Sequence, residues 1–346
     1  MFLHRLIEAH WRKPNPYLTW FLAPLSRLFA FMVNKRRQKY LSGSLKSETL
    51  SCPVVVVGNL HAGGTGKTPI TSALISALQA RGVKVGVISR GYGRTLKDIH
   101  ILHSGSHATQ AGDEPLMLFR QTGVPIAVGA NRIQAGKALL AANPSIQLIL
   151  ADDGLQHYAM AREIEICVFP QADLAKTHLD VLPNGILREP LSRLQTVDFI
   201  VISNGEENNR TQAVQQFSLP ENIKVFYSQT QTALPYRFTK PNEIWHLGCL
   251  KTGQTCAAIA AIAKPERFFN TLKNMGFALQ ETRTLPDHRP ISLADLPQAD
   301  VVFITEKDAV KLPKNAPNHI WVLPIKAHIE PDLAQEILAK LNIQAA

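Results

Sequence analysis

The amino-acid sequence predicts an α/β fold in which helices cover both faces of a mostly parallel sheet. Short apolar runs alternate with helix-like segments along most of the 346 residues, as strands and crossover helices alternate in such sheets. The run at residues 54–57 is all valine, which is typical of a parallel strand buried on both faces. A glycine-rich turn follows it and precedes a helix-like segment. The composition, 45% hydrophobic and 18% charged, indicates an ordered globular protein.

The first 48 residues are basic and are interleaved with aromatic and aliphatic side chains. Nine Lys or Arg residues stand there against two Glu residues, a balance of +7 within the net charge of +10. Pro24 and Arg27 interrupt the apolar run at residues 17–33, which makes it short and broken for a membrane-spanning helix, and no small-residue cleavage site indicates a signal peptide. We expect a helix that binds an anionic membrane surface. A helix packed only on its own domain is the main alternative; a nucleic-acid partner is not expected.

The glycine-rich turn has the sequence of a phosphate-binding loop (P-loop). It consists of Gly63, Gly64, Thr65, Gly66, Lys67 and Thr68. Backbone N–H groups of residues 63–67 are expected to surround the phosphates of a nucleoside triphosphate, with Lys67 at the β- and γ-phosphates and Thr68 on a magnesium ion. The usual pattern has a glycine where His61 stands, but the Gly-x-Gly-Lys-Thr core is intact. The predicted fold is therefore of the P-loop NTPase type.

The remaining elements continue the α/β alternation. Strands are expected at residues 83–89, 124–128, 146–150, 165–169, 199–203, 225–228, 245–248, 301–305 and 320–323, and helices at residues 69–80, 131–142, 265–275 and 331–341. The polar, turn-rich residues 204–210 indicate a boundary. We therefore expect an N-terminal membrane-docking segment at residues 1–48, a nucleotide-binding core at 49–205, and a smaller α/β subdomain at 206–346 that closes the active-site cleft. Continuation of the core sheet into this last part is the alternative.

The four cysteines do not indicate a metal site or a disulfide framework. They stand at positions 52, 167, 249 and 256, without the spacing of metal ligands. We expect reduced thiols, as in a protein that faces the cytosol.

Two acidic residues follow the expected strand at residues 146–150. Asp152 and Asp153 stand at its C-terminal edge, where ligands bind in open α/β sheets. In P-loop proteins an acidic residue at this position orders magnesium. One of the two carboxylates is expected to serve the metal, and the sequence does not separate them. His157 adds a polar group at the same edge.

Further polar residues follow other expected strands. Tyr92 and Arg94 lie in a glycine-containing segment after the second strand, and Arg132 lies after the third; both arginines are candidates for anion binding. Asp113 begins a probable helix, where an acid is also common for helix-dipole reasons. His288, beside Asp287, is a candidate general base, although most loop histidines are not catalytic.

Taken together, these motifs resemble the tetraacyldisaccharide 4′-kinase family, the lipid A 4′-kinases, in the order of that family and over nearly the whole chain. The matching residues are 58–60, 63–69, 89–93, 112–115, 152–157, 187–191, 265–269, 287–288 and 305–310. Leu155 stands where an aromatic residue is expected and Arg289 where a second histidine is frequent. Neither departure touches the expected chemistry.

The resemblance implies phosphoryl transfer from ATP, with Mg²⁺, to the 4′-hydroxyl of a lipid disaccharide 1-phosphate, a step in making lipid A at the cytosolic face of the inner membrane of Gram-negative bacteria. It implies that Asp113 is the base and His288 its partner, with Asp287 helping to set the imidazole. Asp152 joins Thr68 as a metal ligand. Further candidates are Asp153 as a catalytic residue, Glu189 as a metal ligand, and Tyr92, Arg94, Arg132 and His157 as substrate contacts. No obligate protein partner is expected.

Two other functions fit parts of the sequence. A P-loop kinase or ligase of a soluble metabolite would leave the apolar N-terminal segment unexplained and would act without detergent. A regulatory nucleotide switch or partitioning ATPase would hydrolyse ATP slowly without a lipid acceptor.

Overall fold

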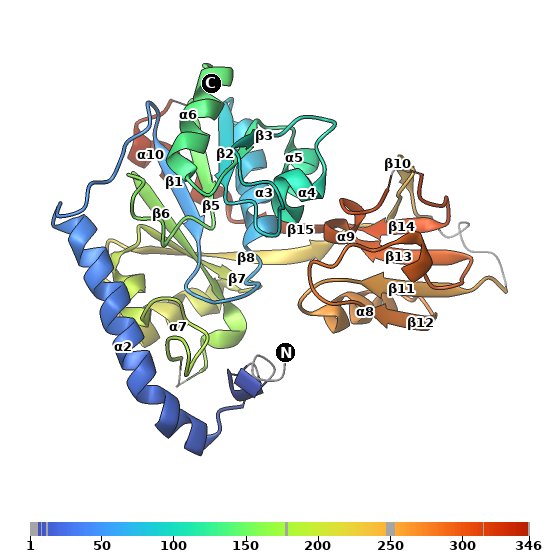
Figure 1. The fold of residues 1–346 in the computed structure, drawn as a ribbon, viewed down its shortest axis with the longest axis horizontal. Coiled ribbons are helices and arrows are strands. Elements are labelled where there is room, and N and C mark those ends of the chain that lie inside the picture. The colour runs from blue at the N-terminus through green and yellow to red at the C-terminus, as the bar shows by residue number, and fades with distance from the viewer. Residues whose placement is uncertain are drawn as a thin grey trace.

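The computed structural model describes residues 6–7, 9–11, 13–176, 179–246, 253–313 and 315–344. A larger part of the molecule contains a nine-stranded sheet and a smaller part contains a six-stranded sheet (Figure 1). The strands β8 and β15 of the first sheet extend toward the second (Figure 1).

The first sheet has the strand order β15-β8-β7-β6-β1-β5-β2-β4-β3. Its strands are β1 (Val54–Gly58), β2 (Val85–Ser89), β3 (His100–Ile101), β4 (Ile126–Val128), β5 (Leu148–Asp152), β6 (Ile164–Pro170), β7 (Phe199–Ser203), β8 (Lys224–Thr232) and β15 (Ile325–Ile329). All neighbours pair in parallel except β3 and β15, which pair antiparallel at the two edges. The predicted mostly parallel sheet is thus confirmed.

Helices cover both faces of this sheet, as predicted. Because successive strand residues point to opposite faces, Val55 and Val57 join one apolar core while Val54 and Val56 join the other. The first core includes side chains of α3 (Lys67–Gln79), α5 (Asp113–Thr122) and α10 (Pro331–Leu341). The second includes side chains of α6 (Arg132–Ala142) and α7 (Glu207–Phe217). Shorter helical segments are α4 (Ala108–Ala111), η1 (Gln171–Asp173) and η2 (Leu191–Thr196).

The second sheet has the order β10-β9-β14-β13-β11-β12. Its strands are β9 (Tyr236–Arg237), β10 (Lys240–Ile244), β11 (Cys256–Ala260), β12 (Leu279–Thr284), β13 (Val301–Thr305) and β14 (Ile320–Leu323), accompanied by α8 (Pro265–Asn274), η4 (Leu293–Asp295) and α9 (Glu306–Ala309). The strand expected at residues 245–248 is different: Trp245 and His246 come just after β10, and residues 247 and 248 lie outside the described residues. Cys52, Cys167 and Cys256 are free, and Cys249 also lies outside the described residues.

The first sheet continues past residue 205, which is the alternative given for the C-terminal part. Residues 204–210 lead from β7 into α7, which is the crossover helix to the parallel strand β8. The chain then enters the second sheet and returns to the first at β15. Where it passes between the sheets, Ala233 N donates to Pro324 O at 3.3 Å. The turn-rich residues 204–210 therefore belong to the crossover between β7 and β8. The strands of the second sheet lie within residues 236–323.

The N-terminal helix α2 (Pro16–Leu41) is longer than the interrupted apolar run suggested. Asn15 caps it by accepting from Tyr17 N and Leu18 N, and the helix continues through Pro24 for 26 residues. Its length and a mean hydropathy of 1.2 over its most apolar window suffice for a membrane-crossing helix by length and composition alone. Only 11% of that window is buried, unlike the core helix of a soluble protein. Figure 1 shows α2 along the outer side of the larger part, away from the second sheet.

One narrow side of α2 attaches it to the rest of the protein. Leu22 and Ser26 are its buried residues, and Phe29 packs against the second core. Ser26 Oγ donates to Val181 O at 3.0 Å and accepts from Asn184 N at 2.9 Å. The rest of the helix carries exposed large side chains, namely Tyr17, Trp20, Phe21, Leu25, Leu28, Phe31, Met32 and Leu41.

Candidate active site

The glycine-rich turn joins β1 to α3, in the strand–turn–helix order that was predicted. Gly63 and Gly66 have φ angles of 130° and 83°, which favour glycine, and Gly66 is the N-cap of α3. A Cβ atom built on Gly63 or Gly64 would meet nothing within 4 Å, so the space beside this backbone is open. The turn is held from below, because Asn59 Nδ2 donates to Thr65 Oγ1 at 2.7 Å. The free N–H groups and the open space fit the phosphates of a nucleotide.

His61, at the usual glycine position of the motif, supports the turn by a buried contact. Its Nε2 lies 3.0 Å from Asp173 Oδ2, and its ring packs edge-on against Phe169. Burial would raise the pKa of Asp173, but its contacts with His61 and Lys176 outweigh burial and lower that pKa to about 2. The histidine at the usual glycine position is therefore part of the buried packing next to the loop.

Asp152 and Asp153 lie in different electrostatic environments. Asp152 ends β5, is buried, and its Oδ1 has no hydrogen-bond partner among the described residues. Burial raises the pKa of Asp152 to about 7, and the negative charge of Glu114 adds to the effect. An unpaired buried carboxylate oxygen of this kind is suited to bind a cation.

Asp153 is instead paired with two cations. Its left-handed backbone, with φ at 49°, accompanies a carboxylate whose Oδ1 lies 3.2 Å from Lys67 Nζ. Arg188 Nη1 lies 3.1 Å from Oδ1 and 3.0 Å from Oδ2 of the same group. Burial alone would raise the pKa of Asp153, but the charges of Lys67 and Arg188 outweigh it and lower that pKa. Arg132 Nη2 also donates to Asp153 O at 2.8 Å.

Within the described ranges, no cluster of three or more His, Cys, Asp or Glu side chains is arranged to hold a metal ion. A cation at Asp152 would complete its ligand set with phosphate oxygens, a hydroxyl and water. Mg²⁺ is bound in this manner in proteins that use nucleotides.

A histidine from the second sheet contacts the first residue of α5. His288 Nδ1 lies 3.0 Å from Asp113 Oδ2. Asp113 lies at the edge of the first sheet where β1 and β5 end, because α5 runs back toward the start of β4. His288 has φ at 64°, and its ring meets Tyr92 edge-on at 5.2 Å between centroids.

The far side of the His288 ring faces a lysine and a carboxylate. Lys307 Nζ lies 3.3 Å from His288 Nε2 and also contacts Asp287 Oδ1 at 3.4 Å and Glu114 Oε1 at 3.5 Å. Because an ammonium group can only donate, Nε2 of His288 accepts a hydrogen bond from Lys307. The ring proton is therefore on Nδ1, which donates a hydrogen bond to Asp113. The predicted pair of Asp113 and His288 is thus brought together, with Asp287 and Tyr92 beside it.

His157 lies in a strongly cationic region. Burial lowers the pKa of His157 to about 4, and the charges of Arg132, Arg162, Arg36 and Arg90 lower it further in the same direction. His157 Nε2 and Arg132 Nε are buried without a hydrogen-bond partner in the described part of the chain. Since Arg36 belongs to α2, the basic end of the N-terminal helix reaches the electrostatic surroundings of this histidine.

Two predicted site residues are engaged by protein groups instead. Arg94 donates to the carbonyl groups of Asp98, Val128 and Lys97. The two carboxylate oxygens of Glu189 accept hydrogen bonds from Tyr158 and from Gln156. These contacts favour structural roles for both side chains.

Sequence reasoning missed the second cation at Asp153. Arg188 lies in the segment 187–191 that contributed to the resemblance, but Glu189 was selected from it as the candidate ligand. Lys307 lies in the segment 305–310, which also contributes to the resemblance, and its contact with His288 was not predicted. In both cases the available signal is a basic residue next to an acidic one: Arg188 precedes Glu189, and Lys307 follows Glu306.

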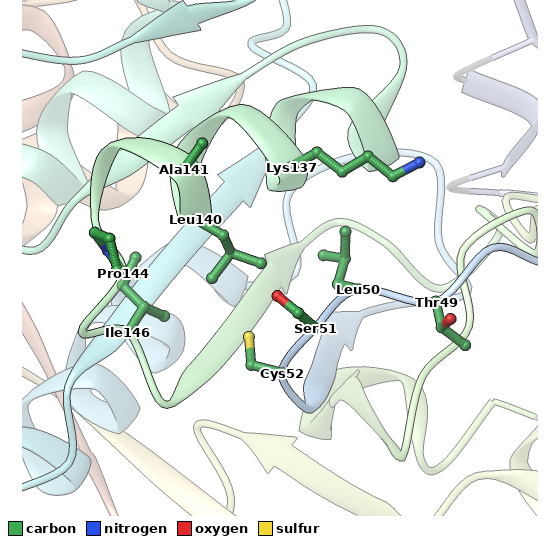
Figure 2. A pocket seen from close by; sticks show the side chains of 9 residues that line it. All are labelled: Thr49, Leu50, Ser51, Cys52, Lys137, Leu140, Ala141, Pro144 and Ile146. Atoms are coloured by element: carbon green, nitrogen blue, oxygen red, sulfur yellow. The ribbon is translucent and has the colours of Figure 1, made fainter.

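A separate surface hollow lies between α6 and the segment before β1 (Figure 2). It has a volume of about 580 Å³ and is lined by Leu50, Cys52, Lys137 and Leu140 among others. Its charged lining group, Lys137, is paired with Glu48 at 2.9 Å. None of the predicted site residues lines it, so it is distinct from the P-loop region.

Comparison with known proteins identifies the family. The sequence matches the family described as Tetraacyldisaccharide-1-P 4'-kinase over residues 18–342. The chain belongs to this family. A tetraacyldisaccharide 4′-kinase of Neisseria meningitidis serogroup C is 56% identical over 340 residues, which cover 98% of this chain and 96% of the relative. Another, from Chromobacterium violaceum, is 43% identical and covers 98% of both chains.

A solved structure agrees in fold with the tetraacyldisaccharide-1-P 4′-kinase family assignment. The structure described as the "apo" form of LpxK from Aquifex aeolicus in complex with ATP has a TM-score of 0.78 and 26% identity, covering 94% of this chain and 99% of that one. The resemblance, the P-loop α/β fold and the kinase class predicted from the sequence are confirmed. As a member of this family, the protein is a kinase of lipid A biosynthesis.

Proposed function

We propose that this kinase transfers the γ-phosphoryl group of ATP to the 4′-hydroxyl of a tetraacyldisaccharide 1-phosphate with Asp113 as the general base. The observation that carries the proposal is the 3.0 Å contact between His288 Nδ1 and Asp113 Oδ2. A sugar hydroxyl is a poor nucleophile, so a carboxylate oriented by a histidine supplies the proton acceptor that the reaction requires. The ATP complex of the Aquifex aeolicus relative supports ATP as the donor.

The P-loop residues bind the donor in this proposal. The N–H groups of residues 63–67 and the ammonium group of Lys67 contact the phosphates, and Asp153 orients Lys67 through their 3.2 Å contact. Thr68, buried at the start of α3, and Asp152 are the residues that would hold Mg²⁺. When bound, Mg²⁺ neutralises charge on the β- and γ-phosphates. Asp152 is preferred to Asp153 as the ligand because its Oδ1 is unpaired, whereas both oxygens of Asp153 already face cations.

The acceptor side uses groups from both sheets. The Nδ1–H group of His288 donates a hydrogen bond to one oxygen of Asp113. The other oxygen remains free to take the proton of the sugar hydroxyl. Lys307 donates to the other nitrogen of the imidazole, and Asp287 contacts Lys307 and accepts from the backbone N–H of His288 at 3.0 Å. The second sheet therefore contributes His288 next to Asp113, and this contact supports the proposal that the C-terminal part closes the active-site cleft. Catalysis rests on positioning and on charge stabilisation.

The lipid substrate and the membrane are proposed to meet the protein at α2. Its exposed aromatic and aliphatic side chains suit the acyl region of a bilayer, and its C-terminal half carries Lys35, Arg36, Arg37 and Lys39 for anionic headgroups. His157 lies in the electrostatic surroundings of Arg132 and of Arg36 from α2, and Tyr92 lies beside His288. We propose Arg132, His157 and Tyr92 as contacts of the anionic disaccharide. This arrangement supports peripheral membrane association, and we propose the cytosolic face of the inner membrane as the location.

Transfer of radiolabel from γ-labelled ATP to a detergent-solubilised tetraacyldisaccharide 1-phosphate, in the presence of Mg²⁺, tests this function. A labelled bisphosphorylated lipid is expected with the wild-type chain and not with Lys67→Ala. Release of labelled phosphate at the same rate without the lipid, and no labelled lipid with it, would contradict the proposal and favour a nucleotide switch. Labelling of a soluble sugar in preference to the lipid would favour a metabolite kinase.

A further inference from the structure

A buried lysine lies between the Asp113–His288 pair and the core of the second sheet. Lys311 follows α9, and its side chain is 2% exposed. Its ammonium nitrogen Nζ lies 2.8 Å from Asp308 Oδ1, 3.3 Å from Arg289 O and 3.7 Å from Asp113 Oδ2. The three acceptors belong to α9, to the loop that carries His288, and to the first turn of α5.

The position of this ammonium group is set by Asp308. Asp308 is fully buried, and its Oδ2 accepts from Ala261 N at 3.1 Å and from Thr305 Oγ1 at 2.7 Å. Its Oδ1 therefore faces Lys311 from a carboxylate that is held at the end of the second sheet. A buried ammonium group is tolerated only when charged and polar partners compensate for its lost hydration, and Asp308 and Arg289 O do so here.

The contact with Asp113 has a different character from the other two. At 3.7 Å, Lys311 attracts the carboxylate without a hydrogen bond, so the oxygens of Asp113 stay available to His288 and to a hydroxyl. The same Oδ2 atom accepts from His288 Nδ1. In addition, Lys311 holds the carbonyl of Arg289, the residue next to His288. One side chain thus contacts Asp113, from the first sheet's α5, and the residue next to His288, from a loop of the second sheet.

We propose that Lys311 is a positioning residue for phosphoryl transfer, which holds the carboxylate of Asp113 and the His288 loop in their mutual geometry. This inference rests on the proposed role of Asp113 as the base. Lys307 serves the outer face of the imidazole, where it is more exposed, while Lys311 acts from the buried side. A change at Lys311 should therefore affect the chemical step and leave the binding of ATP at the P-loop intact.

The test compares Lys311→Met with Lys311→Arg in steady-state kinetics with lipid acceptor. For Lys311→Met we expect kcat to fall at least about tenfold while KM for ATP stays within about twofold, because Lys311 contacts no P-loop residue. Lys311→Arg, which keeps the charge, should recover part of kcat. Lys224→Met is a matched control, since Lys224 pairs with Glu336 at 2.6 Å on an exposed surface. Unchanged kcat in folded Lys311→Met would overturn the inference.

A double-mutant cycle separates positioning from a general structural effect. If Lys311 acts through Asp113, Lys311→Met should lower kcat much less in an Asp113→Asn background than in the wild type. An equal loss in both backgrounds would contradict the inference. Wild-type turnover of Asp113→Asn would overturn the base assignment itself, whereas a loss in Asp113→Asn with none in Lys311→Met would overturn only the role of Lys311.

A second variant guards against misfolding caused by an unpaired buried carboxylate. Asp308→Asn keeps an oxygen for Ala261 N and Thr305, and combined with Lys311→Met it removes both charges together. We expect the combined variant, which leaves no buried charge unpaired, to have a melting temperature close to that of the wild type and to keep the loss of kcat seen in Lys311→Met. Wild-type kcat in the combined variant would count against the role of Lys311.

Discussion

His288 Nδ1 lies 3.0 Å from Asp113 Oδ2, although the two residues are 175 positions apart in the chain. Asp113 is held by α5 of the first sheet and His288 by a loop of the second. The pair therefore exists only when the two sheets are in their observed relation. A small displacement between them would separate the proposed base from the group that orients it.

We expect Asp113→Asn to lower kcat at least about 100-fold, the low end of general-base effects. The amide keeps the shape of the side chain but accepts a proton poorly. His288→Ala should lower kcat less, because Asp113 remains present but is no longer oriented. The measurement is lipid phosphorylation with purified enzyme, with circular dichroism as the control for folding. Near-normal turnover of Asp113→Asn would exclude it as the base.

The contact between Lys67 and Asp153 leads to a separate prediction about ATP. Lys67→Met should lower kcat/KM for ATP at least about 100-fold, because one charge-assisted donor to the phosphates is lost. Lys137→Met is the control, since its partner Glu48 is exposed and remote from the P-loop motif. Asp153→Asn should have a smaller effect, because Lys67 keeps its charge but loses its 3.2 Å partner. An equal effect of Lys137→Met would argue against a specific phosphate contact.

The environment of Asp152 predicts that binding of Mg²⁺ and ATP releases a proton. Its pKa of about 7 means that the carboxyl group is largely protonated at pH 6, whereas a metal ligand must be ionised. Affinity for Mg²⁺–ATP should therefore rise with pH up to about 7 and change little above it. Calorimetric titration at pH 6 in buffers with different ionisation enthalpies measures the released proton. Asp152→Asn should abolish the release, and an unchanged release in that variant would contradict the assignment.

His157 predicts a loss of stability in mild acid. Because its folded pKa of about 4 lies below the ordinary value of 6.5, the unfolded chain binds more protons between these two values. Its contribution is fully present above pH 6.5 and is lost as the pH falls from 6.5 toward 4. His157→Gln should show a shallower fall in melting temperature over this window than the wild type. Parallel curves for His157→Gln and wild type would refute the expectation.

The sequence predicted the P-loop and its neighbouring strands because that motif is local. Gly63 through Thr68 and the valines of β1 carry their own signals of turn, helix start and burial. The end of the first sheet was not predictable in the same manner, because β8 and β15 join it only after tertiary pairing. The strand β12 was missed because its residues alternate between partly buried and exposed positions and are mostly polar.

The site was predictable where a motif named its residues and not where partners came from elsewhere. The pairing of Asp113 with His288 came from the family resemblance, since no local pattern joins residues so far apart. Lys311 has no local signal that distinguishes it from surface cations; its burial and its distance to Asp113 do. Arg94 is the opposite case. The sequence predicted that it binds an anion, but its guanidinium group donates to carbonyl groups of its own loop.

The exposed face of α2 predicts which aromatic residues bind the membrane. Trp20 and Phe31 are 82% and 61% exposed, whereas Phe29 packs against the second core, so replacing Phe29 would disturb folding as well. Burial of an aromatic side chain in an apolar phase contributes about 1.5–3 kcal/mol. Trp20→Glu with Phe31→Glu should therefore weaken binding to anionic vesicles at least about tenfold, measured by co-sedimentation. ATP binding should be unchanged, because neither residue contacts the P-loop.

The control for this experiment is an exposed apolar residue on the other sheet. Ile244, at the end of β10, is 47% exposed, and Ile244→Glu should leave vesicle binding unchanged. Added salt should weaken binding of the wild type through Arg36, Arg37 and Lys39, since each basic residue near an anionic surface contributes about 1 kcal/mol. The aromatic variant should keep this salt dependence, because its basic residues are intact. If the two Glu replacements left partitioning unchanged, α2 would be a packed domain helix and the membrane contact would lie elsewhere.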